Sequence, residues 1–137
     1  MVYAILQNST LTLKSETDVI RLWMDVADKG LHTGIDIACT EVYSAIPGTV
    51  LQINKSDYYS VLVQYDANHL INYCHLTSVD VHPGQMLSAA IKLGDVDKYA
   101  HVEYWVRHKQ SPFPIGFGSE TYYKVDPFPF LQQCKYE

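Results

Sequence analysis

Short apolar stretches alternate with turn-forming residues along most of this chain. β-Branched and aromatic residues dominate the stretches, and many follow a period of two, which is typical of strands with one buried face. Gly, Pro, Asn and Asp separate them at a spacing that suits hairpins. The strands predicted with most support cover residues 41–45, 48–54, 58–65, 69–76 and 100–107. The pattern therefore predicts an all-β protein, built as an antiparallel sheet or sandwich.

Residues 15–30 fit two structures. A helix could be capped by Ser15 or Thr17 and ended by Gly30. A strand through residues 19–24 fits almost as well, so at most one short helix is expected, near the N-terminus. The stretch from Ser111 onward is rich in proline, glycine and aromatic residues, which predicts an extended arm lying on the body.

Composition limits the function classes. With 137 residues, 47% of them hydrophobic and 18% charged, the chain is expected to fold as a single globular domain. Its net charge of -5 argues against nucleic-acid binding, and its apolar runs are too short for membrane insertion. The three cysteines, Cys39, Cys74 and Cys134, have no paired spacing, so structural thiols are expected rather than disulfides or a thiolate zinc site. Residues 1–8 lack a basic segment and a cleavage site, which predicts no signal peptide and synthesis in the cytosol.

The candidate chemistry lies on two histidines and one aspartate. Asp36 follows His32 by four positions, and His101 lies in a predicted strand near the other end of the chain. Two imidazoles and a carboxylate are a suitable ligand set for catalytic zinc, which commonly has three protein ligands and an open fourth position. The sequence therefore predicts a metal-dependent hydrolase.

Further motifs accompany these residues, and together they resemble one family. They occur in this order: His32-Thr33-Gly34-Ile35-Asp36-Ile37-Ala38, Val42-Tyr43-Ser44-Ala45-Ile46-Pro47-Gly48-Thr49-Val50, Tyr73-Cys74-His75-Leu76, Val81-His82-Pro83-Gly84-Gln85, and Tyr99-Ala100-His101-Val102-Glu103. The set resembles the lysostaphin/LytM-type zinc endopeptidases, which cut peptide cross-links of bacterial peptidoglycan. The resemblance implies a half-open β-barrel with the metal at the floor of a groove, and a peptidase-like domain over residues 31–137. Residues 1–30 would then be an extension packed on the body.

The resemblance also assigns roles to individual residues. His32, Asp36 and His101 would be the zinc ligands, and His75 would be one of two catalytic histidines beside the metal. Tyr99 stands where the family has the other, and a phenol is a poor base near neutral pH, although it can donate a hydrogen bond to an oxyanion. Glu103 has no ligand role in the motif, so a structural contact is expected for it.

Residues 94–98 occupy the place of a glycine-rich turn that forms one wall of the family's substrate groove. Here that loop is expected to be short and charged. Two functions therefore fit the sequence. One is a zinc metalloendopeptidase acting on peptidoglycan peptides. The other is a catalytically impaired structural or wall-binding module, or a regulator of another wall hydrolase, on the same scaffold. The predicted lack of a signal peptide favours a bacteriophage tail or virion component, which would associate with other virion proteins and act on the wall from outside.

Overall fold

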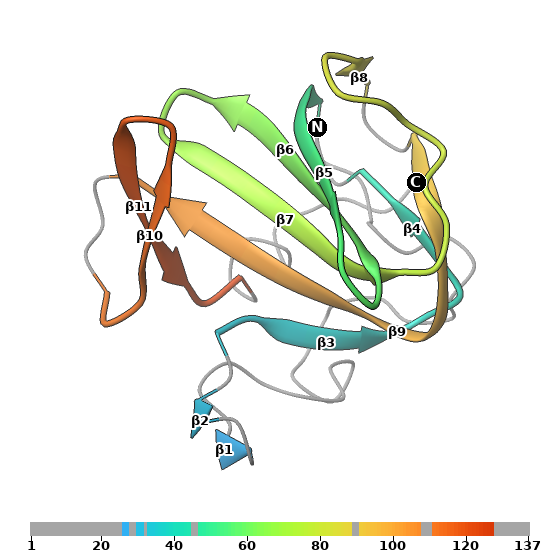
Figure 1. The fold of residues 1–137 in the computed structure, drawn as a ribbon, viewed down its shortest axis with the longest axis horizontal. Coiled ribbons are helices and arrows are strands. Elements are labelled where there is room, and N and C mark those ends of the chain that lie inside the picture. The colour runs from blue at the N-terminus through green and yellow to red at the C-terminus, as the bar shows by residue number, and fades with distance from the viewer. Residues whose placement is uncertain are drawn as a thin grey trace.

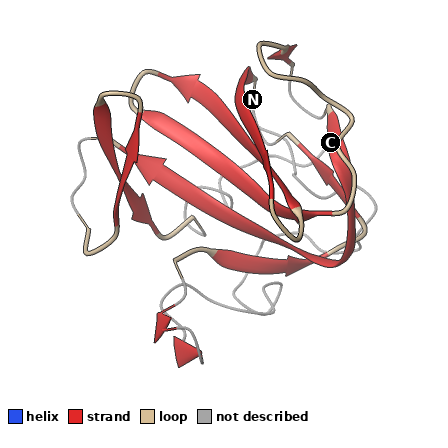
Figure 2. Cartoon of the chain, viewed as in Figure 1, coloured by secondary structure: helices blue, strands red, loops and turns tan. Residues whose placement is uncertain are grey.

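A curled antiparallel sheet organises the protein, as a computed structural model shows for residues 26–27, 30–31, 33–44, 47–88, 91–107 and 111–127. Its strands are β3 (Ile35–Ala38), β4 (Glu41–Tyr43), β5 (Gly48–Lys55), β6 (Tyr59–Asp66), β7 (His69–Leu76), β8 (Met86–Leu87), β9 (Lys92–Val106), β10 (Pro114–Phe117) and β11 (Glu120–Val125). A separate pair is formed by β1 (Val26–Ala27) and β2 (Gly30–Leu31). The described residues contain no helix, and none of them forms a segment that could cross a membrane as a helix (Figure 2).

The long strand β9 joins the two halves of the sheet. The main order is β10-β11-β9-β7-β6-β5-β8, and β3 and β4 pair with β9 as well. One edge of β9 therefore carries β7, while β3, β4 and β11 pair with it at different points along its length. Figure 1 shows the resulting curl, with β3 lying along β9 on the side away from β5 and β6. This arrangement confirms the predicted all-β fold and half-open barrel.

Three predicted strands match the structure closely. β5, β6 and β7 begin and end within one residue of the ranges predicted from alternation, because their burial follows the apolar pattern. The prediction over 41–45 is met by β4, which ends at Tyr43, while Ala45 lies outside the described residues. The helix or strand predicted over 15–30 also lies outside them, apart from β1 and Gly30.

The loop predicted over residues 94–98 is wrong, because β9 runs through it without a break. Gly94, the first residue of the predicted loop, allows a close approach between backbones: a Cβ there would lie 2.0 Å from the carbonyl oxygen of Ser78. The amide of Val96 donates to the carbonyl of Thr40, and Leu93 and Val96 are buried. Buried apolar residues and a cross-strand hydrogen bond thus keep the charged stretch extended.

The extended arm predicted from Ser111 onward is also wrong, because residues 114–125 form the hairpin β10–β11. Its turn contains Gly118 at a φ of 60°, a conformation that glycine adopts readily. β11 continues the main sheet through Tyr123, which pairs with Val106 of β9. Pro114 sits at the start of edge strand β10, where its missing N–H costs no ladder bond.

Two apolar clusters hold β9 from opposite faces. The larger core includes Val102 and Ala100 of β9 with Ile35 and Ile37 of β3. The smaller cluster is made by four buried side chains: Leu62, Leu70, Trp105 and Tyr122. Among the cysteines, Cys39 and Cys74 are free thiols, as expected, and burial raises the pKa of Cys39 to about 11; Cys134 lies outside the described residues. The middle of β9, which carries the candidate site, is therefore packed on both sides.

Candidate active site

The pairing of β3 with β9 brings two predicted metal ligands together. Asp36 lies directly opposite His101 in the strand register, and Asp36 Oδ1 is 2.8 Å from His101 Nδ1. Both side chains are largely buried, with exposed fractions of 8% for Asp36 and 14% for His101. The third predicted ligand, His32, lies outside the described residues. The structure thus brings Asp36 and His101, 65 positions apart in sequence, into contact.

Gly34 lets the imidazole of His101 lie close to the segment that carries Asp36. A Cβ at Gly34 would lie 2.5 Å from the carbonyl oxygen of Val102 and 2.8 Å from Cε1 of His101. Real Cβ atoms do not approach other atoms this closely, so a side chain at this position would displace the backbone of β9 or the ring. The glycine inside the His-x-Gly-x-Asp motif therefore serves packing against the site rather than a turn.

The Gly34→Ala variant is expected to lose about 1–3 kcal/mol of unfolding free energy, the usual penalty of overpacking. The matched control is Gly116→Ala on the exposed strand β10, where an added Cβ meets nothing within 4 Å. Chemical denaturation of both variants would measure the difference. Equal stability of the two variants would contradict the close packing described for Gly34.

Glu103 is a second buried carboxylate beside His101. Its Oε2 accepts from His101 Nε2 at 3.0 Å and from Thr33 Oγ1 at 3.3 Å, and its Oε1 accepts from Trp105 Nε1 at 3.0 Å. Lys124 of β11 adds an ion pair, with Nζ 3.2 Å from Oε1. Glu103 thus makes the structural contact expected for it, and its four donors come from three separate parts of the sequence.

These carboxylates control the charge of the site. Burial alone would lower the pKa of His101, but its hydrogen bonds to Asp36 and Glu103 outweigh burial and raise the pKa to about 9. Burial would raise the pKa of Glu103, but the hydrogen bond from His101 and the charge of Lys124 lower it to about 2. At neutral pH these two shifts favour a protonated His101 imidazole beside an ionised Glu103 carboxylate.

A β-bulge positions His75 near this pair. The register between β7 and β9 shifts between Cys74 and Leu76, and His75 has a φ of 71°, the only positive value among the described residues other than glycine. Bulges of this kind redirect a side chain and are frequent beside active sites. The His75 ring lies 6.2 Å from that of His101. Burial and the charge of His101 both lower the pKa of His75, so it stays neutral near pH 7.

Two tyrosine rings flank His75. The ring centroid of Tyr99, on β9, is 4.8 Å from that of His75. The ring centroid of Tyr58, in the turn between β5 and β6, is 5.0 Å from that of His75. Tyr99 and His101 are two residues apart on β9, so their side chains leave the same face of the strand. The four predicted site residues that the structure describes, namely Asp36, His75, Tyr99 and His101, therefore gather at one place.

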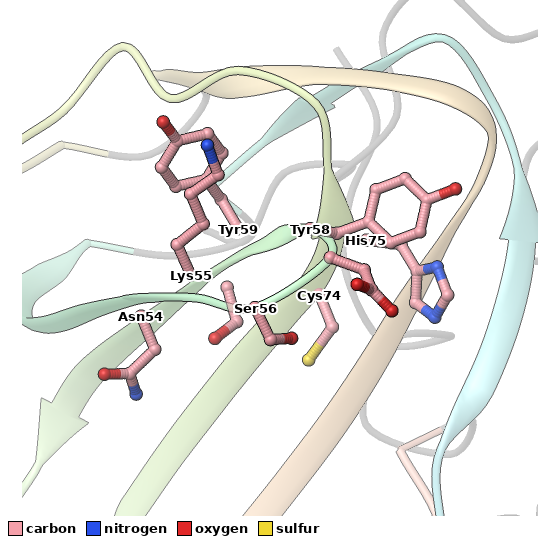
Figure 3. Close-up of a pocket in the computed structure, with 9 residues that line it drawn as sticks. Asn54, Lys55, Ser56, Tyr58, Tyr59, Cys74 and His75 are labelled. Carbon is pink, nitrogen blue, oxygen red and sulfur yellow. The ribbon is translucent and has the colours of Figure 1, made fainter.

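Two adjoining hollows meet at His75. The larger, about 520 Å³, lies against the β5–β6 turn, and the close-up in Figure 3 shows Tyr58 beside the His75 ring, with Cys74 behind. The smaller, about 200 Å³, is lined by Tyr58, His75, Asp97, Lys98 and Tyr99. The sequence pattern put Tyr58 in a strand, but β6 begins at Tyr59 and the Tyr58 side chain is 44% exposed. Tyr58 is thus a groove residue for which alternation gave no signal.

The family assignment comes from comparison with known proteins. The model of peptidase family M23 matches residues 30–114, well over half of the chain, and this range includes Asp36, His75, Tyr99 and His101. The chain belongs to peptidase family M23. A comparison with curated protein sequences finds no significant match.

Solved structures of M23 peptidases share the fold of this M23 chain. The antimicrobial peptidase lysostaphin from Staphylococcus simulans superposes with a TM-score of 0.72 at 17% identity, over 97% of this chain and 55% of that one. A zinc-containing peptidase from Vibrio cholerae gives 0.64 at 13% identity, over 100% and 41%. The catalytic domain of a variant of EnpA, a prophage-encoded M23 protein from Enterococcus faecalis, gives 0.58 at 20% identity, over 80% and 88%. This M23 chain therefore spans about half the length of the lysostaphin structure.

The described donor atoms of this M23 chain are of the kinds that bind zinc. No group of three His, Cys, Asp or Glu side chains among the described residues is arranged to hold a metal. Asp36 and His101 nevertheless offer a carboxylate oxygen and an imidazole nitrogen side by side, both of which zinc prefers. The other nitrogen of His101 is hydrogen-bonded to a carboxylate, as metal-bound histidines usually are.

Proposed function

We propose that this protein is a zinc metalloendopeptidase that cuts peptide cross-links of bacterial peptidoglycan. The observation that carries the proposal is the gathering of His75 and Tyr99 beside the Asp36–His101 pair, at the junction of two hollows. The similarity to lysostaphin, described as an antimicrobial peptidase, and to a zinc-containing peptidase supports the class of reaction. The open groove beside His75 suits an extended peptide.

Each predicted site residue has a role in this proposal. His32, Asp36 and His101 would hold the metal, which when bound lowers the pKa of a water ligand and polarises the scissile carbonyl. His75 is neutral near pH 7 because burial lowers its pKa, so it can accept a proton from the attacking water and pass it to the leaving amine. Tyr99, whose ring lies 4.8 Å from that of His75, would donate a hydrogen bond from its hydroxyl to the developing oxyanion.

We further propose that the protein acts as a bacteriophage tail or virion component, associated with other virion proteins. The similarity to the catalytic domain of a prophage-encoded M23 protein supports this proposal. A peptidase carried by a virion reaches the wall from outside the cell without export from the host.

The experiment that tests the activity is release of new amino termini from purified peptidoglycan by the zinc-loaded protein. We expect release that a chelator abolishes and that the His101→Ala variant lacks. Peptidoglycans with different cross-bridges should be compared, because the bridge that is cut defines the substrate. No release from any of them by folded, zinc-loaded protein would contradict the proposal.

The second candidate function is a structural or wall-binding module, and one observation favours it. β9 is continuous from Lys92 to Val106, so residues 94–98 form no loop beside the site. A shallower groove would hold a substrate peptide less firmly than a walled one. Sedimentation of the protein with peptidoglycan, without release of amino termini, would support the module.

A further inference from the structure

Glu103 is the most heavily bonded acidic side chain of the site, and the proposed function gives it no role. Its exposed fraction is 8%, and each carboxylate oxygen accepts from more than one donor. A carboxylate that is buried on this scale is stable only when its lone pairs are satisfied and its charge is balanced. Lys124 balances that charge from β11.

The donors to Glu103 belong to the segments that carry the proposed metal ligands. Thr33 directly follows His32 in sequence and bonds to Oε2, the same oxygen that accepts from His101. Trp105 holds the other oxygen through its indole N–H, and its ring is fixed in the smaller apolar cluster. Glu103 thus ties the start of the Asp36 segment to β9 at the point where the two strands pair.

A histidine binds a metal through one ring nitrogen, and a hydrogen bond at the other nitrogen decides which one is free. His101 Nε2 lies 3.0 Å from Glu103 Oε2, while Nδ1 lies 2.8 Å from Asp36 Oδ1. The contact with Glu103 therefore occupies Nε2 and leaves Nδ1 facing the carboxylate of Asp36, the other proposed ligand.

We propose that Glu103 is a positioning residue of the metal centre, which orients His101 so that its Nδ1, together with Asp36, binds zinc. This inference rests on the proposed function only in the identity of the metal, and needs no peptidase activity. Glu103 acts through His101 and touches neither metal nor substrate. Lys124 balances the charge of the Glu103 carboxylate, with its Nζ 3.2 Å from Oε1.

The test is the zinc affinity of the Glu103→Gln variant, measured by competition with a chromophoric chelator. We expect affinity to fall about 10–100-fold, the range found when such supporting groups are removed. The matched control is Glu120→Gln, the same chemical change at a carboxylate whose Oε2 pairs with Arg107 at 2.8 Å, 44% exposed on the outer hairpin. Equal affinity of Glu103→Gln and Glu120→Gln would overturn the proposal.

A second measurement separates orientation from simple stability. In zinc-loaded wild-type protein, ¹⁵N NMR of the imidazoles should find His101 protonated at Nε2 and metal-bound at Nδ1. The reverse assignment would overturn the proposal. If Glu103→Gln does not fold, Thr33→Val removes one donor without changing side-chain shape and should weaken zinc binding in the same direction; an unchanged affinity would count against the proposal. Zinc binding without peptide release would contradict the proposed function alone.

Discussion

The His75→Ala variant is expected to cleave peptidoglycan peptides about 10²–10⁴-fold more slowly than the wild type, with zinc content unchanged. His75 is the neutral imidazole of the site, because burial and the charge of His101 lower its pKa. Its ring is 6.2 Å from that of His101, so its removal should spare the Asp36–His101 pair. Single-turnover rates at saturating zinc, with metal analysis of the same samples, would measure both quantities.

His69→Ala is the matched control for this variant. His69 lies at the opposite end of β7, where it pairs with Asp66 at 2.6 Å and stacks on Tyr65. We expect it to keep the wild-type rate. A His75→Ala rate equal to that of the control would show that His75 transfers no proton, and the proposed mechanism would then be wrong. A loss of zinc from His75→Ala would instead make His75 part of the metal centre.

The strands of the sheet could be predicted where one face is apolar and the turns are polar. β5, β6 and β7 end at polar turns and their buried residues are all apolar, although β6 buries residues on both faces: Val61 and Val63 in the larger core and Leu62 in the smaller cluster. The first half of β9 does not fit this rule, because Gly94, Asp95, Asp97 and Lys98 are typical loop residues. Asp95 is accommodated by a 2.9 Å ion pair with Lys92 on the same strand, and Gly94 by its close approach to Ser78. The approach of Gly94 to Ser78 is a tertiary contact, as is the 3.2 Å hydrogen bond that Ser78 Oγ donates to Asp95, and local sequence encodes neither.

The candidate site was predictable in its residues but not in its geometry. The ligand types of Asp36 and His101 and their motif spacing led to them directly, and the structure places them in contact. The positive φ of His75 and the bulge that carries it depend on how β7 meets β9, which no pattern within β7 reveals. Glu103 was expected to make only a structural contact because the motif gives it no ligand role. Its partners could not be predicted in full, since Thr33 and Lys124 come from distant parts of the chain, the latter from a hairpin predicted as an arm.

Tyr99 is the residue that decides between the enzyme and the module. Removing its hydroxyl in Tyr99→Phe is expected to lower the cleavage rate about 10²–10³-fold, the usual cost of losing one oxyanion donor. The phenyl ring would keep the 4.8 Å contact with His75, so folding and zinc affinity should stay at wild-type values. The rate at saturating substrate is the quantity to measure, because an interaction made only in the transition state changes kcat rather than KM.

The companion variant Tyr99→His restores the histidine that the family motif has at this position, and it interprets either outcome of Tyr99→Phe. If Tyr99 is an oxyanion donor, Tyr99→His should keep or raise the activity, because an imidazole can also donate a hydrogen bond there. If the wild type is inactive and Tyr99→His alone releases amino termini, Tyr99 is the residue that prevents catalysis. The native function would then be that of the structural or wall-binding module. If Tyr99→Phe cleaves as fast as the wild type, the hydroxyl takes no part, and His75 carries the proton chemistry alone. If none of the three proteins is active, the groove beside the continuous strand β9, rather than Tyr99, prevents catalysis.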